Sequence, residues 1–223
     1  MTSPFHYCHV RATIIGEEAT LPETPNPWLD SLRRSTEPSS SVHVEKAAPV
    51  TAPMTGPQQP QKGIASPSAQ LPVRECSETP ALWIVGAHGG SGESSLAALD
   101  QDWLPANHSW PRQLGRTVVV LSCRSSAAGL LAAQASATQW AAGLVPDVEL
   151  LGLVIIADAP GRLPRPLRDL AQLVSGGVPR AWSIPWIESW RLGDTSDMTT
   201  APRAVHQFAA DAAALTKNER ETR

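Results

Sequence analysis

Four short apolar runs mark the middle of the chain, and they predict buried strands. They cover residues 81–85, 117–122, 150–157 and 181–184, and apolar residues follow one another in them rather than alternating with polar ones. Such continuous runs, rich in branched side chains, are typical of strands that are covered on both faces. Between them, residues 93–99, 126–142 and 164–174 carry apolar side chains at helical spacing. Strands alternating with helices predict right-handed crossovers, a parallel sheet and a three-layer α/β fold.

The rest of the chain differs from this region in composition. Twelve of the 21 prolines lie in the first 80 residues, whereas 12 of the 15 glycines follow residue 80. A proline- and serine-rich segment with few apolar residues buries too little surface to offset the entropy lost on ordering. We therefore expect a long disordered N-terminal tail over residues 1–79, an α/β domain over 80–193 and a C-terminal tail over 194–223. Within this last tail, residues 205–215 have the pattern of a short helix.

Charge and cysteine content exclude several classes of function. Residues 81–193 contain eight arginines and eight acidic residues, and no basic stripe predicts nucleic-acid binding. The three cysteines, Cys8, Cys76 and Cys123, have neither metal-ligand spacing nor a disulfide framework. The longest apolar run is far shorter than the roughly 20 residues that span a bilayer, and the N-terminus lacks a signal-peptide pattern. We expect a reduced, cytoplasmic protein without a membrane span.

The turn after the first predicted strand carries the candidate chemistry. A strand, a glycine-rich turn and a helix gather backbone N–H groups and the positive end of the helix dipole, and such a site favours anions. The turn reads Gly86-Ala87-His88-Gly89-Gly90-Ser91-Gly92-Glu93-Ser94-Ser95. No lysine lies in the predicted domain, because Lys46 and Lys62 precede it and Lys217 follows it.

This turn resembles the deviant Walker A loop of the ParA/MinD family of ATPases, in which one lysine precedes two glycines and a second precedes Ser or Thr. Five residues match the loop, while His88 and Glu93 stand at its two lysines. Asp158 follows a strand where the family often has an adenine-contacting Asn, and residues 182–185 resemble its closing Ile-Pro element. The resemblance implies a reduced P-loop NTPase fold, with nucleotide contacts at Gly89, Gly90, Ser91, Gly92, Glu93, Ser94, Ser95 and Asp158. The whole chain resembles an uncharacterised bacterial family of lysine-less loop proteins.

Glu93 changes what this loop can do. A lysine at that position neutralises phosphate charge during transfer, whereas a carboxylate about 4 Å from a phosphate is repelled by on the order of 4 kcal/mol. Ser94 would contact Mg²⁺ if Mg-nucleotide were bound, but residues 100–116 contain no strand that ends in the second, aspartate ligand. We therefore expect a non-catalytic pseudo-NTPase that acts as an interaction or regulatory module with a protein partner, without catalytic residues, metal or cofactor.

Three interpretations of the loop stay open. Glu93 can simply be a first-turn residue of a helix capped by Ser91, so that the protein supplies its own anion. The loop can bind nucleotide or phosphate weakly. Alternatively, an arginine replaces the missing lysine in an active ATPase that uses ATP and Mg²⁺; the nearest arginines in sequence are Arg112, Arg116 and Arg124.

Other residues have both a functional and a structural interpretation. His88 is either a base or ligand, or a structural loop residue. Arg162, Arg165 and Arg168 either gather an anion or form a solvated helix start. Residues 26–34 form either a docking helix or a chance apolar cluster. The tryptophans either form a partner-binding patch or pack against the sheet edge; they are Trp182, Trp186 and Trp190.

Overall fold

Five parallel strands form the central sheet of the computed structural model, which describes residues 52–193 and 199–221. Their order across the sheet is β3 (Trp103–Pro105), β2 (Leu82–Gly86), β5 (Thr117–Arg124), β6 (Val148–Ile156) and β7 (Ala181–Ile184). Every neighbouring pair is parallel. The predicted parallel α/β sheet is confirmed, and its four predicted strands are β2, β5, β6 and β7.

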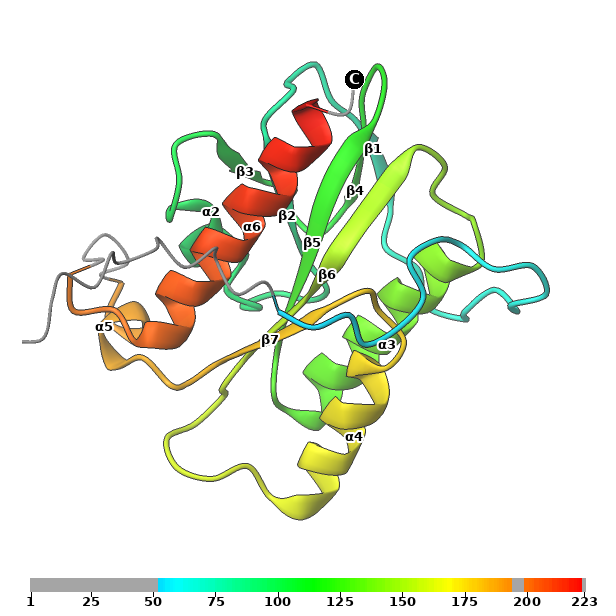
Figure 1. Ribbon diagram of the computed structural model, residues 1–223. Coiled ribbons are helices and arrows are strands. Elements are labelled where there is room, and N and C mark those ends of the chain that lie inside the picture. Colours follow the sequence, from blue (N-terminus) through cyan, green and yellow to red (C-terminus); the bar gives the residue numbers. More distant parts are fainter. Residues whose placement is uncertain (1–51, 194–198, 222–223) are drawn as a thin grey trace, which may run out of the picture. The chain divides into compact units, whose positions relative to one another are not determined.

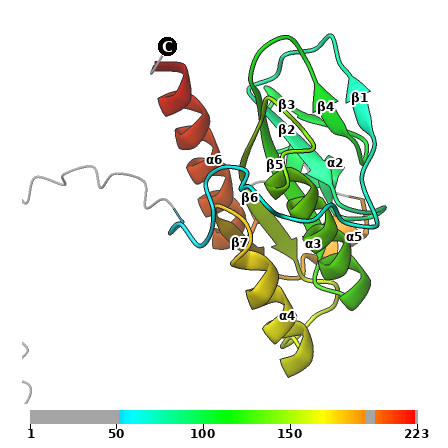
Figure 2. The ribbon, with the colours of Figure 1, turned by 90° about the vertical axis from the view of Figure 1, so that its right-hand side faces the viewer.

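Helices cover both faces of the sheet. On one face lie α3 (Ala127–Ala141) and α4 (Arg165–Ser175), and on the other lie α2 (Glu93–Ala97) and α6 (Arg203–Glu221) (Figures 1 and 2). The short α5 (Glu188–Arg191) follows β7. The result is the three-layer arrangement that the alternation of elements predicts.

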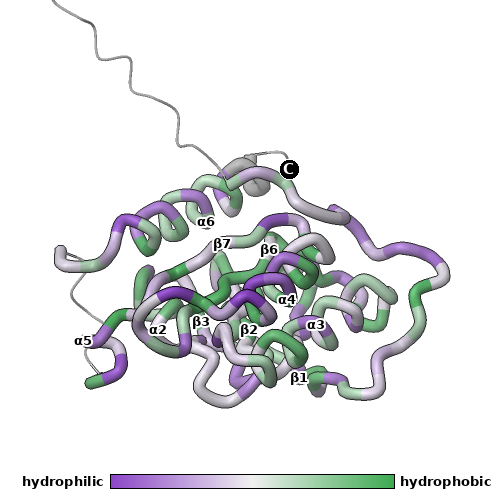
Figure 3. Tube along the Cα trace, turned by 90° about the horizontal axis from the view of Figure 1, so that it is seen from below, coloured by the Kyte–Doolittle hydropathy of each residue, from purple (hydrophilic) through white to green (hydrophobic). Residues whose placement is uncertain are grey.

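The central strands are apolar without interruption because both of their faces are buried. Along β5, Val119 and Leu121 pack into the core on the α3 side, whereas Val120 packs into the core on the α6 side. In β2, Trp83 packs into the core on the α3 side and Ile84 packs into the core on the α6 side. Figure 3 shows these hydrophobic strands between α6 and α3.

Residues 52–79 are not the disordered tail that their composition predicts. They run along the domain, where the backbone N–H of Thr55 donates to Pro179 and the backbone of Leu71 bonds twice with the buried side chain of Gln139. The strand β1 (Val73–Glu75) pairs in parallel with β4 (Trp110–Arg112). The prediction from composition is wrong here because prolines lose little backbone entropy on ordering. A few hydrogen bonds to the domain are therefore enough to order this segment. Residues 1–51 lie outside the described residues.

The C-terminal segment also differs from its prediction. The helix α6 extends well beyond the expected 205–215, and its Phe208 is fully buried between Trp103 and Trp182. The two ring pairs are edge-on, with centroids 5.6 and 5.4 Å apart. Buried Asp211 accepts hydrogen bonds from the Trp182 indole and from a backbone N–H of the N-terminal segment. This helix is therefore part of the domain rather than a tail.

Two short strands that the sequence did not predict lie between residues 100 and 116. They are β3 and β4, each three residues long, and β3 lies next to β2 at the edge of the sheet. Each contains a proline and is too short to give a periodic signal. Residues 106–108, which follow β3, are Ala-Asn-His, so the strand still offers no aspartate for a metal. Among the described helices, none combines the length and the apolar character needed to cross a membrane.

Candidate functional site

A polar cavity lies over the glycine-rich turn, at the carboxyl ends of β2 and β5. From β2 the chain continues to β3, toward one edge of the sheet, and from β5 it continues to β6, toward the other edge. Such a switch point is where open α/β sheets bind ligands. The cavity has a volume of about 280 Å³ and is lined by His88, Gly89, Gly90, Arg124, Ser126, Asp158, Trp186, Ile187 and Arg191.

Glycine is required at only part of this turn. Gly90 and Gly92 have φ angles of 75° and 89°, which favour glycine. A Cβ on Gly92 would also lie 2.4 Å from Cδ1 of Ile156, whereas nothing lies within 4 Å of the Cβ positions of Gly89 and Gly90. The turn is therefore packed on the sheet at Gly92 and open at its tip.

Ser91 does not cap the following helix. The N-cap of α2 is Gly92, which makes no side-chain capping bond. The fully buried Ser91 hydroxyl instead accepts a hydrogen bond of 3.1 Å from the Ser122 hydroxyl on β5. This contact ties the turn to the neighbouring strand, so Ser91 serves the packing of the loop.

The Glu93 carboxylate is buried at the base of the turn. The residue is only 5% exposed, and a Cβ on Gly86, at the end of β2, would lie 2.9 Å from Oε2. The Nδ1 atom of His108 lies 3.0 Å from Oε2, although the two atoms do not meet the geometry of a hydrogen bond. The backbone N–H of His108 donates to Oε1 at 3.3 Å. The backbone N–H of His108 thus holds the carboxyl group in place.

The loop that carries His108 adopts an unusual backbone conformation. Asn107 and His108 have φ angles of 55° and 54°, in the left-handed region that non-glycine residues rarely enter. The loop is secured on both sides, because Ala106 N–H donates to Ile84 and the Ser109 hydroxyl donates to Ala106. Strain of this kind persists where surrounding contacts fix it, and it often marks functional sites.

His88 has a structural role in the turn. Its Nε2 accepts a hydrogen bond of 3.0 Å from the backbone N–H of Arg124, and its Nδ1 lies 2.9 Å from the Gly89 carbonyl. These partners assign the proton to Nδ1 and describe a neutral imidazole. Of the two interpretations of His88, the geometry favours the structural one.

Arg124 is the arginine that lies against the glycine-rich turn. Its Nε donates to the Gly90 carbonyl at 2.9 Å, and its Nη1 donates to the Ala157 carbonyl at 3.2 Å. Burial lowers the pKa of this guanidinium, while the Asp158 carboxylate opposes the shift and Arg191 adds to it. The side chain remains a cation at any physiological pH. The other two candidate arginines pair elsewhere, Arg112 with Glu75 and Arg116 with Glu149.

The structure brings together only part of the predicted site. Gly89, Gly90 and Asp158 line the cavity, while buried Ser91 and Glu93 and half-buried Gly92 do not. The hydroxyl candidates Ser94, which is exposed, and Ser95, which is half-buried, also lie outside it. Sequence reasoning missed two residues, His108 and Arg191. Neither belongs to a motif, and only the fold brings them to the loop.

The three tryptophans separate in space. Trp182 is buried against Phe208, and Trp190 is half-buried on the same core. Trp186 lines the cavity, and its indole N–H donates to Glu188. Packing in the core therefore accounts for Trp182 and Trp190, but not for Trp186. The predicted docking segment 26–34 lies outside the described residues.

Within the part of the chain that the structure describes, no three His, Cys, Asp or Glu side chains gather where they would hold a metal ion. No curated protein and no solved structure matches the chain. A family model covers residues 80–207, which is more than half of the chain and includes the turn, the cavity and the five-stranded sheet. The protein therefore belongs to the family of unknown function DUF6668.

Proposed function

We propose that the protein is a non-catalytic, P-loop-like pseudo-NTPase that serves as an interaction or regulatory module and binds nucleotide or phosphate weakly at most. The observation that carries this proposal is the buried Glu93 carboxylate at the base of the glycine-rich turn. In the resembled ATPases, that position supplies the lysine that neutralises phosphate charge. Here the position carries a fixed negative charge.

The surroundings of Glu93 oppose its rearrangement. To make room for a phosphate, the carboxylate would have to leave both the His108 imidazole and the His108 backbone N–H. Leaving the buried carboxylate unpaired costs about 1–3 kcal/mol, in addition to the repulsion from the incoming anion. The carboxylate is thus already engaged by the protein without a ligand.

Titration calorimetry with Mg-ATP and Mg-GTP tests the proposal, using wild-type protein and the variants Glu93→Gln and Glu93→Lys. We expect no saturable heat from the wild type at millimolar nucleotide. Glu93→Gln removes the charge with little change of shape, so it should strengthen binding, and Glu93→Lys should strengthen it further. Tight binding by the wild type, or no gain in either folded variant, would contradict the proposal.

Arg124 supports a second candidate function, a nucleotide-dependent ATPase in which this arginine replaces the lysine. The supporting observation is its direct hydrogen bond to Gly90, next to a cavity that also contains Arg191. A magnesium-dependent phosphate-release assay separates the two candidates. If the second holds, release should be measurable in the wild type and lost in both Arg124→Ala and Ser94→Ala, while exposed Arg203→Ala serves as the matched control.

A protein partner is part of the proposal. Residues 52–79 contribute to the packing of the domain, so a truncated version for this test should keep them and begin at residue 52. Co-purification from the native host should recover a partner with the full chain. Comparison with a version that begins at residue 52 then assigns the partner either to the N-terminal segment or to the domain.

A further inference from the structure

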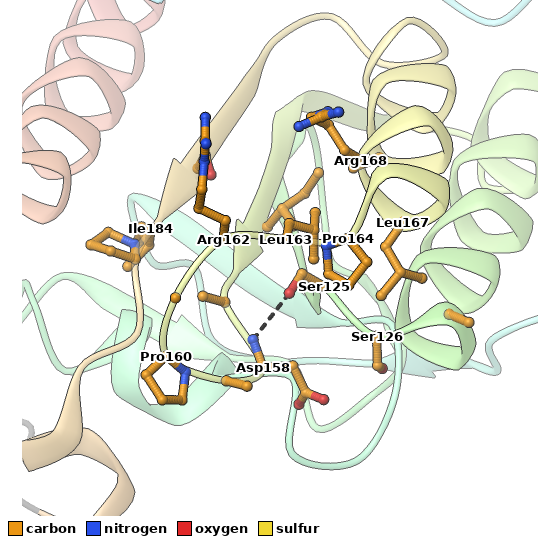
Figure 4. A pocket seen from close by; sticks show the side chains of 18 of the residues that line it. Ser125, Ser126, Asp158, Pro160, Arg162, Leu163, Pro164, Leu167, Arg168 and Ile184 are labelled. Carbon is orange, nitrogen blue, oxygen red and sulfur yellow. Dashed lines mark hydrogen bonds between the residues drawn. The ribbon is translucent and has the colours of Figure 1, made fainter.

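A second and larger cavity lies on the α3 and α4 side of the sheet. Its volume is about 750 Å³, within the range of about 300–1,000 Å³ that is typical of small-molecule sites. It lies between the carboxyl ends of β6 and β7, the first turn of α3, the 157–164 loop and α4 (Figure 4). Glu93 and the tip of the glycine-rich turn are not among its lining residues.

The interior of this cavity is mostly apolar. Ile155 and Ile184 come from the sheet, and Leu163, Leu167 and Ala171 come from the loop and from α4. Val174 is the buried residue of α4, and Leu167 and Ala171 are only partly buried where they pack against the core, so their remaining surface faces the cavity. Removing such side chains from water is favourable, and an apolar ligand body would complete this packing.

Positive charge lies at one rim of the cavity. Arg162 and Arg168 extend toward the same side in Figure 4, whereas the Asp158 carboxylate points to the opposite side. Neither arginine has an ion-pair partner among the described residues, whereas Arg165, which does not line the cavity, lies 3.7 Å from Asp169. The first turns of α3 and α4 contain no acidic residue that would offset this charge.

We propose that this cavity binds a small organic anion, with its apolar body between α4 and the sheet and its single anionic group near Arg162 and Arg168. The two arginines give the site its preference for anions, while the cavity walls accept the body of the ligand. The proposal uses neither Glu93 nor Arg124, although the two cavities share Ser126 and Asp158.

Two fluorescent probes with nearly the same rings test this site on the full chain. Anilinonaphthalene sulfonate carries one negative charge, and N-phenyl-1-naphthylamine carries none. We expect one saturable site for the sulfonate and weaker binding of the neutral amine. The double change of Arg162→Ala with Arg168→Ala should weaken sulfonate binding about five- to tenfold and leave amine binding unchanged.

Two further variants keep the test decisive. Arg165→Ala removes the same charge from the same segment but lies outside the cavity, so it should not affect either probe. Ala171→Leu places a larger apolar side chain in the cavity, in a helix that tolerates leucine, so it should weaken binding of both probes without lowering the melting temperature. Three results would overturn the proposal: no saturable binding, equal loss in Arg165→Ala, or full binding by folded Ala171→Leu.

Discussion

Glu93 and His108 are 15 residues apart in sequence, yet each fixes the position of the other. The carboxylate contacts both the ring and the backbone N–H of His108, and the histidine is held in a left-handed conformation that would otherwise be unfavourable. From the sequence, Glu93 stood out because the turn resembles a loop that has a lysine at this position. Its partner could not, because a single loop histidine carries no local signal.

Removal of His108 should therefore destabilise the domain. We expect His108→Ala to lower the free energy of unfolding by about 1 kcal/mol, because the buried carboxylate loses the neighbouring ring but keeps the backbone N–H of residue 108. Urea denaturation would measure the change. His206 is an exposed histidine on α6, and His206→Ala should change the stability by less than about 0.5 kcal/mol. Equal effects of the two variants would contradict the role of the pair.

Cys123 should be chemically inert in the folded protein. The residue is fully buried in β5, and burial raises the pKa of its thiol to about 12. At pH 8.5 iodoacetamide should modify half-buried Cys76 but not Cys123, and both should react in urea. Mass spectrometry of the tryptic peptides would identify the modified residue. Modification of Cys123 at the rate of Cys76 in the native protein would contradict its burial.

The same shift in pKa makes stability depend on pH in alkaline solution. The unfolded chain releases the thiol proton near pH 9, whereas the folded chain retains it up to about pH 12. The contribution of this group to stability is thus fully present below pH 9. It falls as the pH rises from about 9 to about 12, because only the unfolded state loses the proton there.

At the scale of elements, the sequence predicts those that carry a strong period or a long apolar run. The strands β2, β5, β6 and β7 and the helices α3 and α4 follow from their apolar runs and spacing. The three-residue strands do not, because so short a segment has no period. Residues 52–79 were missed for a different reason, since their order depends on distant anchors such as Gln139.

The glycine-rich turn allows a matched comparison of two glycines. Gly92→Ala should destabilise the domain by about 2 kcal/mol or more. Alanine would have to adopt the positive φ of this position, and its Cβ would overlap Ile156. Gly89→Ala should have little effect, since its Cβ position is open. Thermal unfolding of the two variants would measure the difference. Equal melting temperatures would mean that the turn is not packed on β6 as described.

At the scale of the whole molecule, the sequence predicts the three-layer architecture but not all of the chain that builds it. One face of the sheet is closed by α6, which a polar segment separates from the rest of the domain. The candidate site shows the same limit. The turn, Asp158 and the candidate Arg124 follow from the sequence, whereas Arg191 reaches the cavity and His108 reaches Glu93 only once the strands are ordered in the sheet.

Phe208 tests whether α6 is an integral layer of the domain. We expect Phe208→Ala to lower the free energy of unfolding by about 3–5 kcal/mol, because the ring is fully buried between Trp103 and Trp182. The exposed His206→Ala on the same helix is again the control. A loss below about 1 kcal/mol would show that α6 is a dispensable extension.

A crystal structure determined after soaking in millimolar Mg-ATP tests the central claim most directly. The account predicts an unoccupied glycine-rich turn, with the Glu93 carboxylate still in contact with His108. A triphosphate bound over Gly90 and Gly92, with Glu93 displaced from His108, would contradict it.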